Sequence, residues 1–245
     1  MINKSASLPL SLDYLCIIVP VYNNPLTIAK VVSQIKEVCD LTLIIVDDGS
    51  DVPVESLIPP SKSIIHVRQF PNRGKGVALR CGALKAQELG MHHCITMDGD
   101  GQHFAHDLHR FIEIYSQEQD PHFMVIGVRD FAECTPPSSS VIGRQIGNFW
   151  VWIESGTWVS DTQTGFRLYP LDMLAYESRT TRYEFEIENL VRFLWKKGRI
   201  LETRVKTVYD DSRVSHFDKI KDNLFMIALH ARLVIQRILL LRGIV

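Results

Sequence analysis

The feature that most constrains the fold is the alternation of short apolar runs with amphipathic helical patterns in the first half of the chain. Five runs rich in β-branched residues have the character of buried strands, at 14–20, 41–46, 64–67, 94–97 and 123–128. Three segments with apolar residues at helical spacing lie between them, at 25–38, 76–89 and 105–115. Strands of this kind joined by helices are typical of parallel sheets with right-handed crossovers. The predicted fold class is therefore α/β, with a mostly parallel sheet flanked by helices.

Polar clusters follow four of these strands. Their sequences are PVYNN at 20–24, DDGS at 47–50, NRGKG at 72–76 and DGDGQH at 98–103. Because ligands bind at the carboxyl ends of the strands in such sheets, we expect one shared pocket. Asp48 can accept hydrogen bonds from a base or a ribose, Tyr22 can stack on a base, and Lys75 can meet phosphate. The alternatives are local: Asn24 caps a helix that starts at Pro25, Asp47 and Asp48 only form a turn, and Gly74-Lys75-Gly76 is a loop.

The DGDGQH segment places two carboxylates, Asp98 and Asp100, at the end of a strand. Hard cations such as Mg²⁺ and Mn²⁺ need oxygen ligands and commonly combine one or two carboxylates with substrate phosphates. Gly99 and Gly101 leave room for a diphosphate to approach the backbone. An acid-Gly-acid pair is also typical of a solvated turn. The metal interpretation predicts a phosphate-bearing substrate.

Taken in order, these four motifs resemble those of family 2 glycosyltransferases with the GT-A fold. The similarity is strongest to the branch of dolichol-phosphate mannose synthase and related polyprenyl-phosphate sugar transferases, and it runs from about residue 15 to about residue 216. The resemblance implies that a divalent cation, Mg²⁺ or Mn²⁺, is held by Asp98, Asp100 and Gln102. The resemblance and the chemistry of the motifs together predict these binding residues for a nucleoside-diphosphate sugar: Pro20, Tyr22, Asn24, Val46, Asp48, Lys75, Gly99 and Arg213. Asn24 departs from the Glu that relatives usually carry.

Two arginines in the second half resemble basic positions of the same family. Arg129 follows a predicted strand as part of Gly-x-Arg, and Arg144 lies in the helix after a Pro/Ser-rich loop. Two guanidinium groups can bind an anionic acceptor through bidentate, charge-assisted hydrogen bonds. The alternative is that Arg129 pairs with Asp130 or another acid. On the first interpretation, the acceptor is a lipid-linked phosphate.

The identity of a catalytic base depends on the acceptor. The segments DTQTGFR at 161–167 and YEFEIE at 183–188 resemble further family motifs. A phosphate acceptor is already ionised, whereas a hydroxyl needs a carboxylate to take its proton, and Asp161 and Glu186 are the candidates. The predicted function is metal-dependent, inverting transfer of a sugar to a polyprenyl phosphate or another lipid-linked acceptor. The alternative within this class is transfer to a lipid or glycan hydroxyl.

Two other classes of function are less consistent with the motifs. A sugar-nucleotide nucleotidyltransferase has a similarly wound sheet, but it requires a Gly-rich loop with Arg and Lys after the first strand, where this chain has PVYNN. A non-catalytic nucleotide-binding or partner-binding protein has no need of the acidic cluster. We therefore expect an enzyme of the glycosyltransferase class.

Charge and cysteine content limit the partners and the compartment. The chain has 27 basic and 28 acidic residues, a net charge of −1, so no nucleic-acid partner is predicted. Its five cysteines include no CxxC pair and predict a reducing compartment. The first residues lack a continuous apolar leader segment. These features predict a cytoplasmic protein, with peripheral contact to a membrane.

The last segment predicts an amphipathic helix, and we expect a GT-A domain at 1–217 followed by this helix at 218–245. One stripe of it is apolar: Leu224, Ile227, Ala228, Ala231, Ile235 and Ile238. The opposite face carries Lys219, Asn223, His230 and Arg237. Two interpretations remain open: an interfacial helix with its arginines near anionic lipid headgroups, or a helix packed on its own domain or a partner. The arginines argue against a membrane-spanning helix.

Overall fold

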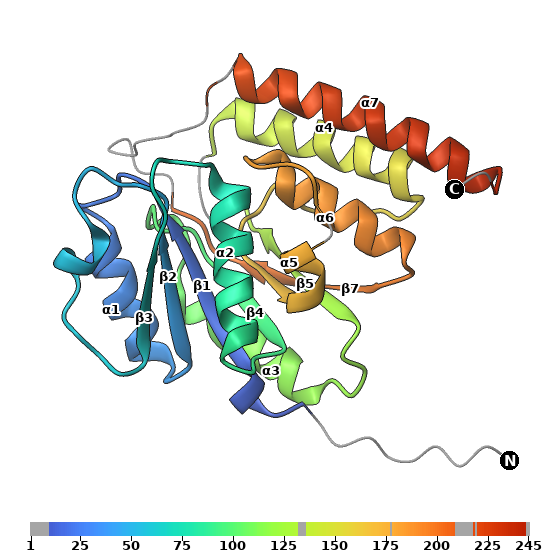
Figure 1. The fold of residues 1–245 in the computed structure, drawn as a ribbon. Helices are drawn as coiled ribbons and strands as arrows, with labels where there is room; N and C mark the ends of the chain where they lie inside the picture. Colours follow the sequence, from blue (N-terminus) through green and yellow to red (C-terminus); the bar gives the residue numbers. More distant parts are fainter. Residues whose placement is uncertain (1–9, 132–135, 177, 209–217, 219, 244–245) are drawn as a thin grey trace, which may run out of the picture.

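A twisted seven-stranded sheet with helices on both faces forms the body of the protein (Figure 1). The structure is a computed structural model, and it describes residues 10–131, 136–176, 178–208, 218 and 220–243. The strands are β1 Leu15–Val21, β2 Thr42–Asp47, β3 Ile64–Arg68, β4 His93–Thr96, β5 Phe123–Arg129, β6 Arg167–Pro170 and β7 Arg199–Val205. The α-helices are α1 Ile28–Val38, α2 Lys75–Glu88, α3 Leu108–Gln117, α4 Ser138–Ser155, α5 Leu171–Tyr176, α6 Glu184–Trp195 and α7 Lys221–Leu241. Three short 3₁₀ turns are η1 Leu12–Tyr14, η2 Val54–Leu57 and η3 Ala105–Asp107.

The sheet confirms the predicted mostly parallel α/β fold. Its strand order is β3-β2-β1-β4-β6-β5-β7, and β6 alone among these strands runs antiparallel to its neighbours. All five predicted strands are present, with ends that shift by at most one residue. β6 and β7 were not predicted, because β6 has only four residues and β7 alternates apolar with charged residues at the edge of the sheet. The order places the ends of β1, β2 and β4 side by side.

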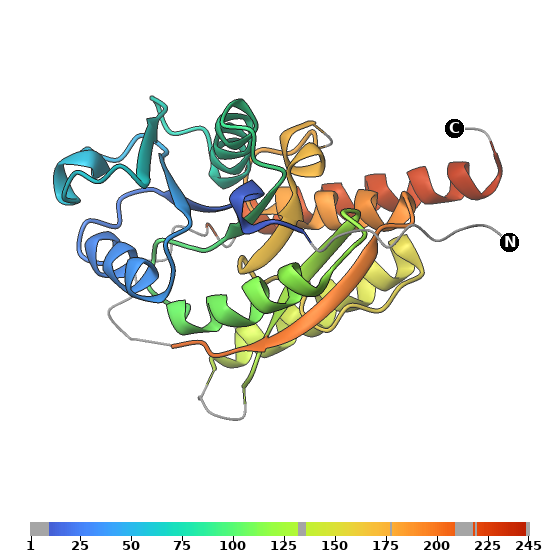
Figure 2. The ribbon, with the colours of Figure 1, turned by 90° about the horizontal axis from the view of Figure 1, so that it is seen from below.

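Two apolar cores lie on opposite faces of the sheet (Figures 1 and 2). Alternate residues of β1 point to opposite sides, so Ile17 and Val19 pack with α1 and α3, whereas Cys16 and Ile18 pack with α2, α5 and α6. The thiols of Cys16, Cys39, Cys81 and Cys94 are free. Burial on both faces accounts for the continuous apolar runs from which these strands were predicted.

The start of α1 corrects one prediction. The helix begins at Ile28 and not at Pro25, and its N-cap residue is Thr27. The Asn24 side chain therefore does not cap it; instead, the backbone carbonyl of Asn24 accepts hydrogen bonds from the amides of Thr27 and Ile28. The Thr27 hydroxyl donates to the carbonyl oxygen of Gly99 at 2.8 Å. This contact fixes the turn after β1 against the acidic segment after β4.

Helices α4 and α7 lie side by side and pack on α6, at one end of the molecule (Figure 1). The predicted helix at the C-terminus is present as α7, but its apolar stripe points outward: Ile227 and Ile235 are 65% and 59% exposed. Its buried face contains Leu229 and Leu233 together with polar His230. By length and composition α7 could cross a membrane. The proposed division between residues 217 and 218 stays a prediction.

Candidate active site

A cavity of about 330 Å³ opens at the carboxyl ends of β1, β2 and β4. We call it the acidic pocket, and these residues line it: Pro20, Val21, Tyr22, Asn24, Asp48, Asn72, Gly74, Lys75, Ala78, Asp98, Gly99, Asp100, Arg182 and Tyr183. Its volume is in the range of small-molecule sites. Three strand ends and the first turn of α2 thus bring together the polar clusters that the sequence placed after separate strands.

The carboxylate of Asp48 holds one wall of the acidic pocket. It accepts hydrogen bonds from the amides of Arg73 and Gly74, both at 2.8 Å, and from the side-chain amides of Gln69 and Asn72. Asp48 is 3% exposed. In this arrangement the carboxylate fixes the loop that leads into α2. Gly74 has a φ of +102°, and its Cα approaches Thr181 so closely that a Cβ there would lie 2.5 Å from the Thr181 carbonyl oxygen.

Asp47 has a structural role in a turn, which was one of the two interpretations that its sequence allowed. Its side chain accepts hydrogen bonds from the amides of Ser50 at 2.8 Å and Val54 at 3.2 Å, so it shapes the turn after β2. That turn is joined to the turn after β1, because the Asn23 amide donates to the Ser50 hydroxyl and the Asp51 amide donates to the Asn23 side chain. The two strand ends are therefore fixed relative to each other.

Lys75, the first residue of α2, joins two carboxylates at the floor of the site. Its Nζ lies 2.7 Å from Asp98 Oδ1 and 2.9 Å from Glu186 Oε2. Burial disfavours the Asp98 carboxylate, but the charge of Lys75 and the His103 side chain, whose Nε2 lies 3.8 Å from Asp98 Oδ2, outweigh it and hold the Asp98 pKa well below its usual range. Burial also opposes the Lys75 ammonium, and the two carboxylates raise the Lys75 pKa despite it. Glu186 Oε1 is buried without a hydrogen-bond partner among the described residues.

The acidic segment after β4 offers oxygen donors of the kind that Mg²⁺ or Mn²⁺ prefers. Asp98 and Asp100 both line the acidic pocket. Within the described part of the chain, no three His, Cys, Asp or Glu side chains gather into a self-sufficient metal site. Two carboxylates fit a cation that also takes oxygens from a bound phosphate. Buried Gln102 Nε2 and His103 Nδ1 lack hydrogen-bond partners among the described residues, so the segment has unused polar capacity.

Gly165 lies in the DTQTGFR motif at 161–167, and its role in the site was not predicted from the sequence. A Cβ at this position would lie 2.4 Å from Asp98 Oδ2 and 2.8 Å from Lys75 Nζ. Its carbonyl oxygen accepts a hydrogen bond from the Thr96 hydroxyl at 2.8 Å. The backbone of the 161–167 segment therefore contacts the ion pair directly, and only glycine leaves space for it.

A second cluster, which we call the arginine cluster, consists of Arg129, Phe131, Arg144 and Asp161. Arg129 forms a bidentate pair with Asp161, Nε to Oδ2 at 2.8 Å and Nη2 to Oδ1 at 2.9 Å. Asp161 is fully buried. The carboxylate paired with Arg129 is thus that of buried Asp161, and Asp130 Oδ2 lies 3.8 Å from Arg204 Nη1. Because both Asp161 oxygens already accept from Arg129, proton uptake by Asp161 would break this pair.

Arg144 joins the arginine cluster from α4. Its Nη1 donates to the carbonyl oxygen of Arg129 at 3.0 Å and lies 3.9 Å from Asp161 Oδ2. The guanidinium carbon lies 3.9 Å from the centre of the Phe131 ring, which is a cation–π contact. Two guanidinium groups thus share one carboxylate. The cluster has one positive charge in excess, which suits an anionic ligand.

The 161–167 segment connects the two parts of the site. Asp161 belongs to the arginine cluster, and Gly165 contacts the Lys75–Asp98 pair. Arg167 is fully buried and donates to the carbonyl oxygens of Thr164, Thr162 and Glu186. These bonds fix the segment against the start of α6. Thus the two parts of the site are not positioned independently.

The remaining predicted site residues lie elsewhere. Val46 is fully buried in the core that packs α2 against the sheet. The Gln102 amide donates to Asp100 Oδ1 at 3.1 Å, and the Gln102 carbonyl accepts from Val208. Arg213 lies outside the described residues. Arg182 and Tyr183 line the acidic pocket but were not predicted, since nothing in their sequence marks them apart from the helix that follows.

Comparison with known proteins agrees with this architecture. Residues 16–166 match the family described as Glycosyl transferase family 2, and the chain belongs to that family. It is similar to a UDP-N-acetylglucosamine–dolichyl-phosphate N-acetylglucosaminyltransferase of Methanococcus voltae, with 26% identity over 80% of this chain and 86% of the relative. It is also similar to a dolichyl-phosphate beta-glucosyltransferase of Dictyostelium discoideum, with 26% identity over 66% of this chain and 55% of the relative.

Among solved structures, the chain resembles glucosyl-3-phosphoglycerate synthase from Mycobacterium tuberculosis in complex with Mn²⁺, uridine diphosphate and glucosyl-3-phosphoglycerate. The TM-score is 0.61 and the sequence identity 19%, over 99% of this chain and 82% of that chain. At this identity the similarity shows the fold. The protein is thus a glycosyltransferase with the GT-A fold, as the sequence predicted.

Proposed function

We propose that this protein transfers a sugar from a nucleoside diphosphate to a polyprenyl phosphate, with inversion at the anomeric carbon and with a bound divalent cation. The observation that carries the proposal is the junction of the acidic pocket with the arginine cluster through the 161–167 segment. The names of the two relatives, which specify dolichyl-phosphate acceptors, support it. The acidic pocket would bind the donor, and the arginine cluster would bind the acceptor phosphate.

Different residues of the site would carry out different parts of the reaction. Pro20, Tyr22 and Asp48 would hold the nucleoside, since they line the wall formed by the ends of β1 and β2. A cation bound at Asp98 and Asp100 would stabilise the negative charge that develops on the diphosphate. An oxygen of the acceptor phosphate forms the new bond to the anomeric carbon, and the bond to the diphosphate breaks with its electron pair. No proton has to be removed, because the acceptor is ionised.

Arg129 and Arg144 would reduce the repulsion between the acceptor phosphate and the donor diphosphate. Arg144 keeps a guanidinium face on Phe131, which holds the group in place while its donors reach a phosphate. Asp161 orients Arg129 through the bidentate pair, so we assign it a positioning role and not that of a base. Lys75 is placed to neutralise Asp98 and Glu186 while the pocket holds no cation.

The proposal also places the protein at the cytoplasmic face of a membrane, where a polyprenyl phosphate is available. Free thiols at Cys16, Cys39, Cys81 and Cys94 are consistent with a reducing compartment. The exposed apolar stripe of α7 is consistent with peripheral contact to lipid.

Release of nucleoside diphosphate tests this function. Purified protein is incubated with a panel of UDP- and GDP-sugars, with Mn²⁺ or Mg²⁺ or with a chelator, and with or without a polyprenyl phosphate. The proposal predicts that release from one donor requires the cation and increases with the lipid phosphate. Release of pyrophosphate from a nucleoside triphosphate would instead support the nucleotidyltransferase class.

A second candidate function, transfer to a lipid or glycan hydroxyl, is favoured by one observation. Glu186 Oε1 is buried and has no hydrogen-bond partner among the described residues, so it could take a proton. If Glu186 is a general base, Glu186→Gln should lower kcat by about a hundredfold or more. With a phosphate acceptor we expect less than about a tenfold decrease, because no proton is transferred. Steady-state rates with a polyprenyl phosphate and with the matching polyprenol separate the two functions.

A further inference from the structure

The outward face of α4 carries a stripe of exposed apolar side chains, interrupted by Gln145. Ile142, Ile146, Phe149 and Trp152 on this face are between 44% and 55% exposed. A helix on the surface of a soluble protein normally turns such residues toward the core and charged residues toward water. Here the inward face holds small or polar residues, among them Gly147 and Asn148. The pattern is therefore reversed relative to an ordinary surface helix.

Helix α7 has a similar pattern, and after Lys221 its charged side chains pack against the body of the protein. Asp222 pairs with Arg182, with Oδ2 3.1 Å from Arg182 Nη2. Arg232 Nη2 lies 3.0 Å from Glu188 Oε1, and the Arg237 guanidinium donates to the Glu154 carbonyl at 2.9 Å. This corrects the expectation that Arg232 and Arg237 reach lipid headgroups.

Two further contacts fix α7 to α4. His230 Nδ1 lies 2.6 Å from Glu154 Oε1, and the Trp150 ring stacks over the His230 ring with a centroid distance of 5.6 Å. Glu154 is fully buried, so this imidazole–carboxylate contact is shielded from water. The polar face of α7 is thus held by partners in α4, α6 and the loop before α6. Its outward face is left with Leu224, Ile227, Ile235 and Ile238.

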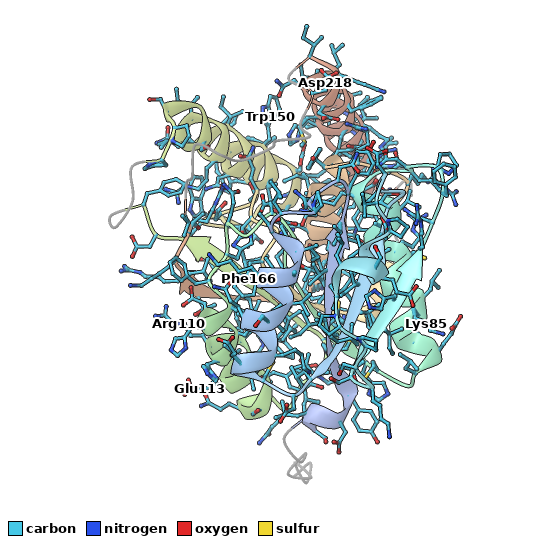
Figure 3. All side chains as sticks on the ribbon, turned by 90° about the vertical axis from the view of Figure 1, so that its left-hand side faces the viewer. Lys85, Arg110, Glu113, Trp150, Phe166 and Asp218 are labelled. Carbon is cyan, nitrogen blue, oxygen red and sulfur yellow. The ribbon has the colours of Figure 1, made fainter. Side chains whose placement is uncertain are left out.

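We call the outward faces of these two neighbouring helices, taken together, the apolar surface. Figures 1 and 3 show α4 and α7 side by side at one end of the molecule, and in Figure 3 Trp150 and Asp218 lie at that end, away from Lys85 and Glu113. Among the described side chains of 138–155 and 223–241, every charged one is buried or partly buried. More than half of the exposed large hydrophobic side chains belong to these two helices. An apolar surface of this extent on a soluble protein marks a contact with lipid or another protein.

We propose that the apolar surface docks on a lipid bilayer, with α4 and α7 lying in the plane of the interface. The absence of exposed charge among the described side chains of 138–155 and 223–241 favours hydrocarbon over a protein partner, whose interfaces normally include a polar rim and hydrogen bonds. Exposed Lys221 and Arg242 at the two ends of α7 complement anionic headgroups. Trp152 supplies an amphipathic ring of the type enriched at membrane interfaces.

The ion pairs exclude a spanning arrangement for α7 in this structure. Crossing the bilayer would require the helix to separate His230 from Glu154, Arg232 from Glu188 and Asp222 from Arg182, and to carry its own charged groups into hydrocarbon. Lying in the interface requires none of these changes, because the charged groups stay with their partners. The helix therefore rests on the membrane together with α4.

Two contacts connect the apolar surface to the candidate active site. Their consequence for the acceptor rests on the proposed function. Arg144 belongs to α4 and to the arginine cluster, and Asp222 in the first turn of α7 binds Arg182 of the acidic pocket. A docked protein would thus present the arginine cluster near the headgroups. The phosphate of a lipid acceptor could enter the site while its chain stays in the bilayer.

Vesicle binding tests the proposal without any turnover. The full chain is centrifuged with vesicles of phosphatidylcholine and phosphatidylglycerol, and the partition coefficient is measured for the wild type and two double variants. These are Ile227→Gln with Ile235→Gln on α7, and Ile146→Gln with Trp152→Gln on α4. Leu84→Gln with Leu89→Gln is the matched control, because both side chains are exposed on or beside α2, away from the apolar surface.

We expect each of the two double variants to bind vesicles at least about tenfold more weakly, because each removes two apolar side chains from the buried area. The control should bind as the wild type does. Quenching of tryptophan fluorescence by brominated lipid should fall in Trp152→Phe. Circular dichroism checks that the variants fold, and substitutions at exposed positions should leave the spectrum unchanged.

Two results would overturn the proposal. One is wild-type binding to vesicles by both double variants. The other is a lipid-independent dimer, detected by light scattering, that the double variants abolish, since the apolar surface would then bind a second copy. Failure of the docking proposal can be distinguished from failure of the proposed function. Vesicle binding without nucleoside diphosphate release would leave the docking surface intact, and release in detergent without vesicle binding would leave the transferase intact.

Discussion

On the wall of the acidic pocket, Asp48 accepts hydrogen bonds from the main-chain amides of Arg73 and Gly74, whereas in the arginine cluster Asp161 is held by guanidinium groups from two other elements. The first arrangement comes from strand ends that lie side by side in a parallel sheet. The second depends on β5 and α4 meeting the 161–167 segment. The pocket is therefore fixed largely by backbone geometry, and the cluster by ion pairs between side chains.

The largest effect is expected in the acidic pocket. Asp100→Ala removes one of the two carboxylates proposed to hold the cation, so transfer should fall by about a thousandfold, while folding is largely retained. The measurement is the rate of nucleoside diphosphate release over a range of Mn²⁺ concentrations. Asp51→Asn, an exposed acid on the same side of the sheet, is the control. Full activity of Asp100→Ala would exclude the metal role of this segment.

A smaller effect is expected where the pocket meets the cluster. Gly165→Ala adds a Cβ that must displace the Lys75–Asp98 pair, and a displacement of this size commonly costs about a hundredfold in rate. Gly143→Ala is the matched control, because its new Cβ meets only the end of the Gln163 side chain at 3.2 Å. The test compares kcat/KM for the two variants. Equal values would show that the ion pair can move freely and that the two parts of the site are not coupled.

In the arginine cluster the main effect should be on stability. Asp161→Asn leaves Arg129 and Arg144 without their shared carboxylate, and breaking a buried pair costs about 3 kcal/mol. Urea denaturation gives the free energy of unfolding. Asp48→Asn would change the pocket instead: one main-chain amide would lose its acceptor, but no buried cation would be left without a partner, so we expect a smaller loss of stability there. The reverse order of losses would contradict the contrast between the two regions.

The smallest effect should be a pH dependence of stability at the α4–α7 contact. Burial raises the pKa of Glu154 above its ordinary value of 4.5, although the His230 hydrogen bond lowers it in part. The folded protein then binds more protons than the unfolded chain, so the contribution of Glu154 to stability declines as pH rises above 4.5. Glu154→Gln should remove this decline and keep an acceptor for His230. The unfolding free energies of the wild type and of Glu154→Gln should converge toward low pH. A difference between them that does not change with pH would contradict the assignment.

The contrast between the two regions also explains what the sequence could predict. Strand runs such as 14–20 are buried on both faces, so their composition is distinctive, and the turns after them follow in chain order. β6 and β7 gave no such signal, because one is very short and the other lies at the edge. The pocket assignments of Asp98 and Lys75 rested on motifs. The pairing of Lys75 with Asp98 and Glu186 did not follow from the sequence, since it joins positions far apart in the chain.

The arginine cluster and α7 show the same limit. Family resemblance marked Arg129, Arg144 and Asp161 as separate residues, but a bidentate pair between Arg129 and Asp161 depends on side-chain geometry. Periodicity predicted the apolar stripe of α7 but not the direction in which it points. That direction is set by the buried partners of Asp222, Arg232 and His230, which lie in three other parts of the chain.

The central claim is that the acceptor is a phosphate bound beside a metal-dependent donor site. The most direct test uses a donor labelled in its sugar, identified from the panel above, and measures label extracted into organic solvent with a polyprenyl phosphate or the matching polyprenol. We predict cation-dependent labelling of the polyprenyl phosphate, little labelling of the polyprenol, and a sharp loss of labelling in Arg144→Ala. Equal or greater labelling of the polyprenol, or full labelling by Arg144→Ala, would contradict the account.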